Sequence, residues 1–225
     1  MGMRSLISAA ERSVHLVDPN ETTRKSISFL LRELGYVVHA YSSLDELLNV
    51  SERLVSGCVL LDLPPPGAND RSAPDWLRSL KIPVIVLSGS GDIATAVEAL
   101  KSGATDFIEK PFRKLVLLDA LAAAVIKPQI VSLNDGSEEA RDSLEALTPR
   151  ERDVLHGLAR GCSNKVIGHE LGISPRTVEI HRARMMNRLG IRSLSHALRL
   201  AFGVGLESEI WRRAPAAEEP VRATT

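Results

Sequence analysis

The most constraining feature of this chain is the run CVLLDL at positions 58–63, which is apolar except for Asp62. A run this short, stopped by three prolines at positions 64–66, is typical of a buried central strand in a parallel sheet. Ligands of open α/β sheets bind at the carboxyl ends of the strands, which is where Asp62 falls. On this stretch alone, a loop aspartate that caps a turn explains Asp62 equally well.

Four further strand-like runs surround the first and alternate with segments of helical periodicity. This alternation predicts an α/β doubly wound, five-stranded parallel sheet with helices on both faces, over residues 14–126. The four runs cover residues 14–18, 36–41, 83–88 and 105–110.

The predicted strands end in polar side chains of complementary chemistry. Asp18, Asp62, Ser88 and Lys110 each close one of them. Because the carboxyl ends of parallel strands meet at one edge, we expect two carboxylates, a hydroxyl and an ammonium to lie together. Four such groups at one edge favour a functional site over a turn cap for Asp62.

Residues 14–126 resemble a two-component receiver domain of the FixJ/NarL type. The resemblance rests on VLLDL, VLSGSGD and ATDFIEKPF, in this order and spacing. It implies that Asp62 is the phosphoacceptor and that Ser88, Phe107 and Lys110 are the switch residues. The chemistry fits, because a carboxylate that attacks a phosphoryl group needs an ammonium and a metal to neutralise the spreading charge.

One departure from the family pattern affects the predicted metal site. Receivers of this type carry two adjacent acids after the first strand, whereas this chain has Asp18 followed by Pro19. The resemblance implies Mg²⁺ held by Asp18, Asp62 and the main-chain carbonyl of Pro64. We expect weak binding, because Mg²⁺ sites use few carboxylates and one is lost here. The side chains of Asn20 and Glu21, which follow Pro19, are alternative oxygen ligands for the metal.

The zero net charge of the chain hides an asymmetry. Residues 1–147 carry 15 Lys and Arg against 20 Asp and Glu, a net charge of −5. Residues 148–213 carry 12 against 6, a net charge of +6. Only the second part is therefore expected to meet a polyanion. Apolar periodicity lapses over 127–143, which predicts a linker, and residues 214–225 are expected to form a disordered tail.

The second predicted domain, residues 144–213, includes this basic part and shows a smaller all-α pattern. Two helices joined by a tight turn at Gly172 predict a helix-turn-helix, and a small helical protein–protein module is the alternative. The segment 147–193, LTPRERDVLHGLARGCSNKVIGHELGISPRTVEIHRARMMNRLGIRS, closely resembles the LuxR-type DNA-binding domain over its whole length. This resemblance favours binding to double-stranded DNA, and it implies that the final helix is the dimer contact of the DNA-bound state.

The helix that begins at Ser174 and Pro175 is the predicted recognition helix. A glutamate can accept a hydrogen bond from cytosine, and an isoleucine can pack on a thymine methyl group. The side chains expected toward the major groove are Thr177, Glu179, Ile180 and Ala183. Those expected to neutralise phosphates are Lys165, Arg176, Arg182, Arg184 and Arg188.

These features predict a cytoplasmic bacterial response regulator and transcription factor. A sensor histidine kinase would phosphorylate Asp62, two receivers would pair through the fourth helix, fifth strand and fifth helix, and the homodimer would bind promoter DNA. We expect no membrane span, because the apolar stretch 115–126 is too short and contains Asp119.

Two rival functions remain to be weighed. A degenerate receiver, regulated by protein contact without phosphate, is supported by Pro19, whereas the retained Asp62, Ser88 and Lys110 speak against it. An aspartyl-phosphate phosphohydrolase would need an acid two residues after the nucleophile, where this chain has Pro64. We therefore do not expect an enzyme.

Overall fold

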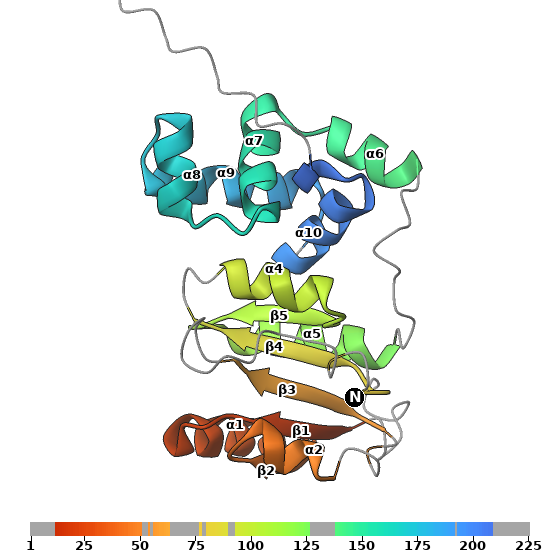
Figure 1. The fold of residues 1–225 in the computed structure, drawn as a ribbon. Coiled ribbons are helices and arrows are strands. Elements are labelled where there is room, and N and C mark those ends of the chain that lie inside the picture. The colour runs from red at the N-terminus through yellow and green to blue at the C-terminus, as the bar shows by residue number, and fades with distance from the viewer. Residues whose placement is uncertain are drawn as a thin grey trace, which may run out of the picture.

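The fold of this chain is a parallel sheet with helices on both faces, joined to a helical module (Figure 1). The computed structural model describes residues 12–50, 54, 56–63, 77, 80–89, 93–126, 138–191 and 193–208. The predicted tail at 214–225 and the prolines at 64–66 lie outside the described residues. The strands are, in spatial order, β2 (Val37–Tyr41), β1 (Ser13–Val17), β3 (Cys58–Asp62), β4 (Val84–Ser88) and β5 (Asp106–Glu109).

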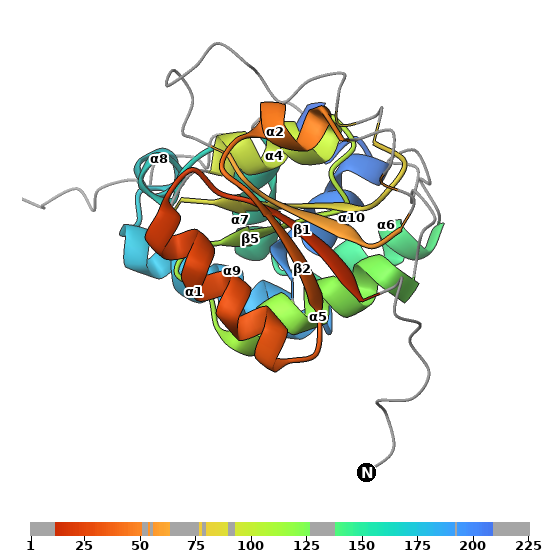
Figure 2. The same cartoon turned by 90° about the horizontal axis from the view of Figure 1, so that it is seen from below.

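Helices cover both faces of the sheet (Figure 2), and an apolar cluster lies on each face. On one face, Leu31 of α1 and Leu117 of α5 pack against β1, β3 and β4. On the other face, Leu47 of α2 and Leu100 of α4 belong to the second apolar cluster. The five-stranded doubly wound prediction is confirmed. The helices are α1 (Glu21–Glu33), α2 (Leu44–Leu48), α4 (Ile93–Lys101) and α5 (Lys114–Ile126).

The second module is all-α, as predicted. Thr148 and Glu151 form a capping box, and Gly172 makes the expected turn between α8 and α9 at φ +67°. Val178 and Met185 of α9 are fully buried. The elements are α6 (Glu138–Glu145), α7 (Pro149–Ala159), α8 (Asn164–Leu171), α9 (Pro175–Arg188), α10 (Leu194–Gly203) and the 3-10 turn η2 (Leu206–Ser208).

The predicted linker over 127–143 is wrong at its C-terminal end. Residues 138–143 belong to α6, and residues 127–137 lie outside the described part. The segment is mostly charged, so the sequence shows no broad apolar stripe. Burial of two apolar side chains anchors this helix. Ala140 and Leu144 lie one turn apart, and both are buried where α6 packs against α10.

The helical module packs against α4 and β5, at one edge of the sheet (Figure 1). The ammonium of Lys101 lies 5.1 Å from the ring centroid of Phe202. Gly161 passes so close to α4 that a Cβ there would lie 3.1 Å from the Cα of Ala94. The module therefore covers part of the surface expected to pair two receivers.

Candidate functional site

Three of the four strand-end residues meet at the carboxyl edge of the sheet. The Lys110 ammonium lies 2.8 Å from Asp62 Oδ2 and 3.4 Å from Asp18 Oδ2. Asp18 directly follows β1, Asp62 ends β3 and Lys110 directly follows β5, after which the peptide bond to Pro111 is cis. The expected meeting of two carboxylates and an ammonium is thus observed.

Asp62 sits in an environment that disfavours its charged form. Partial burial raises the pKa of the Asp62 carboxyl, and the nearby Asp18 carboxylate raises it further. Lys110 acts in the opposite direction, but the net effect is a raised pKa. The Asp62 side chain remains 20% exposed, so an incoming group can reach the carboxylate.

Ser88 ends β4, in the strand next to Asp62, and is 1% exposed. No described group hydrogen-bonds its hydroxyl. An unsatisfied buried hydroxyl costs about 1–3 kcal/mol, so an oxygen that reaches it would relieve that cost. Phe107, the other expected switch residue, is buried in β5 on the α4 side of the sheet.

Arg24 is a member of this site that the sequence did not reveal. Its guanidinium donates a hydrogen bond of 2.6 Å to the main-chain carbonyl of Asp18. The Asp18 carboxylate accepts a second bond, of 2.8 Å, from the amide of Asn20. These two bonds fix the buried Asp18 after β1. The one sequence feature that could have suggested the Arg24 bond is a basic residue six positions after Asp18, the end of the predicted first strand.

The metal-binding side of this edge is short of one ligand. Asp18 and Asp62 offer the hard carboxylate oxygens that Mg²⁺ prefers, whereas Pro19 offers none. Among the described residues, no group of three or more acid, histidine or cysteine side chains is arranged to hold a metal. The carbonyl of Pro64 lies outside the described residues. The donor set present thus fits Mg²⁺ with two side-chain ligands.

The two alternative donors after Pro19 already have partners. The Asn20 amide oxygen caps α1 by accepting a 3.0 Å bond from the Thr23 amide. The Glu21 carboxylate forms a 2.6 Å ion pair with Lys25. A metal would have to share these groups with the helix cap and the ion pair.

The predicted recognition helix, α9, presents most of the expected side chains to solvent. Glu179, Ile180, Ala183 and Arg184 are exposed, as are Lys165 of α8 and Arg176, while Thr177 is half-buried. The Thr177 hydroxyl bonds the capping Ser174 hydroxyl at 2.8 Å. Arg176 and Glu179 form a 2.7 Å ion pair, so an expected phosphate contact and an expected base reader are joined.

Two further arginines of α9 have partners on other elements of the protein. Arg182 lies 3.0 Å from Glu109 of β5, across the contact between the modules. Arg188 donates a 2.9 Å bond to Glu151, whose side chain is 2% exposed. Both cations therefore stabilise the protein itself, which the sequence pattern did not distinguish from phosphate neutralisation.

A polar cluster at the contact between the modules was also missed by the sequence. The Ser193 hydroxyl donates to Asp106 Oδ1 at 3.3 Å, and Arg199 donates to the main-chain carbonyl of Thr105. Burial lowers the pKa of the Arg199 guanidinium, and Asp106 partly offsets that effect. The one sequence feature that could have suggested this cluster is Asp106 within the predicted strand 105–110, because a buried acid needs a polar partner.

No helix in the described part of the chain is long and apolar enough to cross a membrane.

Comparisons with known proteins identify both modules. Residues 14–122 match the family model described as response regulator receiver domain. Residues 145–201 match the model of bacterial regulatory proteins, luxR family.

Relatives span both modules. The transcriptional regulatory protein FixJ of Rhizobium meliloti (strain 1021) is 39% identical over 201 residues, which cover 86% of this chain and 96% of that protein. The response regulator protein TodT of Pseudomonas putida (strain F1) is 36% identical over 190 residues, covering 83% and 84%. A crystal structure of full-length FixJ from B. japonicum aligns at a TM-score of 0.47 with 33% identity, covering 86% and 97%.

Receiver domains generally bind Mg²⁺, and this class of protein works with histidine kinases and DNA. The degenerate-receiver alternative finds no support in these matches. The chain belongs to the FixJ-type response regulators, which are phosphorylation-controlled transcription factors that join a receiver to a LuxR-type DNA-binding domain.

Proposed function

We propose that Asp62 of this chain accepts a phosphoryl group from a sensor histidine kinase. The observation that carries the proposal is the Lys110 ammonium at 2.8 Å from Asp62 and 3.4 Å from Asp18. An Asp62 oxygen attacks phosphorus, the bond from phosphorus to the donor nitrogen breaks, and Lys110 offsets the negative charge of the product. The unpaired Ser88 hydroxyl then donates to a phosphoryl oxygen. No further catalysis is proposed, because Pro64 stands where phosphohydrolases carry an acid.

The metal proposal is that Mg²⁺ binds weakly through Asp18, Asp62 and the carbonyl of Pro64. When bound, it supplies positive charge that neutralises the transferred phosphoryl group. Support comes from the missing oxygen at Pro19 and from the existing partners of Asn20 and Glu21. Replacing Pro19 by Asp should tighten Mg²⁺ binding in a titration. Equal affinities of the two proteins would show that another ligand already serves.

The regulatory proposal is that the docked arrangement is the inactive state of a cytoplasmic regulator. Arg182 of the recognition helix is paired with Glu109, and α10 packs on β5. Glu109 immediately precedes Lys110, so a shift of Lys110 toward a phosphoryl group disturbs this contact. Release frees the α4–β5–α5 surface for pairing of two receivers and α10 for pairing of two DNA-binding domains.

For DNA contact, we propose that residues 144–213 form the binding domain and that the exposed residues of α8 and α9 divide into two roles. Thr177, Glu179, Ile180 and Ala183 face the bases, and Lys165, Arg176 and Arg184 neutralise phosphates. Arg188 is assigned to Glu151 and contributes charge only secondarily. Glu179→Ala should change the preference at about one base position by roughly 1–3 kcal/mol, and Arg176→Ala should weaken all sequences alike.

The test of the phosphoacceptor is incorporation of phosphate from a small-molecule phosphodonor with Mg²⁺, read by intact-protein mass. Asp62→Asn should abolish the added mass, because an amide is not a nucleophile for this transfer. The control is Asp142→Asn, which removes an exposed aspartate of α6 and should be phosphorylated like wild type. Undiminished incorporation in Asp62→Asn would remove Asp62 from this role.

A further inference from the structure

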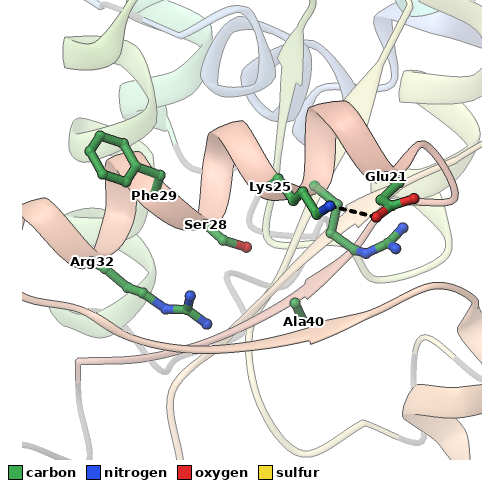
Figure 3. A pocket seen from close by; sticks show the side chains of 7 residues that line it. Glu21, Lys25, Ser28, Phe29, Arg32 and Ala40 are labelled. Atoms are coloured by element: carbon green, nitrogen blue, oxygen red, sulfur yellow. Dashed lines mark ion pairs between the residues drawn. The ribbon is translucent and has the colours of Figure 1, made fainter.

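A second polar site lies on the receiver, in a slot between α1 and the edge strand β2 (Figure 3). Its volume is about 260 Å³, and its floor includes Ala40 of β2. Neither Asp62, Lys110 nor Ser88 lines it. The lining residues are Glu21, Arg24, Lys25, Ser28, Phe29, Arg32 and Ala40.

The slot holds more positive than negative charge. Its single carboxylate, Glu21, is already paired with Lys25 at 2.6 Å. Arg24 and Arg32 each donate one hydrogen bond to a main-chain carbonyl, of Asp18 at 2.6 Å and of Val38 at 3.3 Å. Neither guanidinium pairs with a carboxylate among the residues that the structure describes. Since a guanidinium has five N–H donors, most donors of both remain available.

Ser28 adds a second, independent sign of a ligand. It lies one turn from Arg24 and one turn from Arg32, so the three side chains share one side of α1. Figure 3 shows its hydroxyl on the side of α1 that faces Ala40. The residue is 5% exposed, and no described group hydrogen-bonds its hydroxyl. Ser28 therefore offers the slot a buried hydroxyl without a described partner.

We propose that this slot binds a small anion through Arg24, Ser28 and Arg32. Guanidinium groups recognise phosphate and carboxylate by paired hydrogen bonds, and a serine hydroxyl donates to either anion. A volume of about 260 Å³ leaves room for a small anion such as inorganic phosphate or a short carboxylate.

The proposal is tested by calorimetric titration of the full-length protein with inorganic phosphate and, separately, with succinate. Mg²⁺ is omitted and Asp62 is left unchanged, so that the carboxylates of Asp62 and Asp18 beside Lys110 repel phosphate from the phosphorylation edge. Ionic strength is held constant. We expect saturable one-to-one binding of at least one anion, and the stronger of the two identifies the phosphate or carboxylate class.

Variants locate the binding. Arg32→Gln should weaken binding by at least about tenfold, because a charge-assisted bond is lost, and Ser28→Ala should weaken it less. Arg24→Gln replaces Arg32→Gln if the latter does not fold. Arg150→Gln is the matched control, because it removes an arginine paired with Asp153 in the DNA-binding module and should leave binding unchanged.

Three results would overturn the proposal. The first is heat without saturation for both anions. The second is equal weakening by Arg32→Gln and Arg150→Gln, which would indicate a general charge effect. The third is no anion binding together with slower phosphoryl transfer from a kinase to Arg32→Gln, which would assign the slot to a protein partner.

Discussion

Two polar clusters lie along β5 and its end, and they differ in how completely their atoms are paired. At the phosphorylation edge, the Ser88 hydroxyl has no described partner and the Asp62 pKa is raised, chiefly by burial. At the contact between the modules, Asp106 accepts from Ser193 and Glu109 is paired with Arg182. Unpaired groups suit a site that receives an incoming group, whereas paired groups suit a surface that holds a partner.

The largest expected effect concerns the phosphorylation edge. Lys110→Gln removes the only described ammonium beside Asp62 and Asp18, so the charge that develops on phosphoryl transfer is no longer offset. We expect the phosphorylation rate to fall by about 10²-fold or more, by analogy with loss of one oriented donor in an active site. Lys114→Gln, an exposed lysine of α5, is the control. A rate within twofold of wild type would contradict the role of Lys110.

A second prediction concerns a fully paired acid away from both clusters. Glu151 is 2% exposed, accepts from the Thr148 amide and pairs with Arg188. Glu151→Ala should lower the free energy of unfolding by about 1–3 kcal/mol, measured in urea. Burial raises the Glu151 pKa, but the bonds from Thr148 and Arg188 together lower it below its usual value.

The pH dependence of Glu151 follows from that direction. Because the folded-state pKa is the lower one, its stabilisation is complete above the unfolded pKa, near 4.5. It is lost as pH falls through the folded value. The difference between wild type and Glu151→Ala should therefore shrink below pH 4.5, and a constant difference would exclude this charge effect.

A third prediction tests the paired contact between the modules. Glu109→Ala removes the partner of Arg182 from the receiver side and leaves the DNA-binding module unchanged. A partly buried ion pair is worth about 1 kcal/mol, so unphosphorylated protein should bind promoter DNA about fivefold more tightly. The control is Glu98→Ala, an exposed glutamate of α4. Equal DNA affinity of both variants and wild type would show that this pair does not restrain the DNA-binding module.

The smallest expected effect is a gain in the free energy of unfolding when Asp62 at the phosphorylation edge is replaced. Asp62→Asn should stabilise the receiver at pH 7, because burial penalises the Asp62 charge in the folded state. The folded pKa is raised, so wild type recovers stability as pH falls through that value toward the unfolded one. The gain in urea unfolding should be largest near neutral pH and vanish near pH 4. A loss of stability at pH 7 would show that Lys110 outweighs burial.

The same contrast explains what the sequence predicted. Asp18, Asp62, Ser88 and Lys110 could be placed together because each ends or directly follows a strand of one sheet, so local pattern and topology suffice. The turn at Gly172 is likewise set by local sequence.

Contacts between the modules do not follow from local pattern. Ser193 has the sequence of a helix cap, yet its hydroxyl makes no cap bond and donates to Asp106 instead. Arg182 and Arg184 look alike in sequence, but only Arg182 reaches Glu109. Their roles depend on how two separately patterned modules pack, which periodicity does not encode.

The central claim is that phosphorylation of Asp62 releases the contact between the receiver and the DNA-binding module. The distance between the two modules tests this claim directly. Spin labels are placed at Glu33→Cys of α1 and Asp142→Cys of α6, both exposed, with Cys162→Ser to avoid labelling the partly exposed native cysteine. The account predicts one narrow distance distribution before phosphorylation. After treatment with a phosphodonor and Mg²⁺, it predicts a longer and broader distribution that is absent in Asp62→Asn. An unchanged distribution in protein that is phosphorylated and binds DNA would contradict the account.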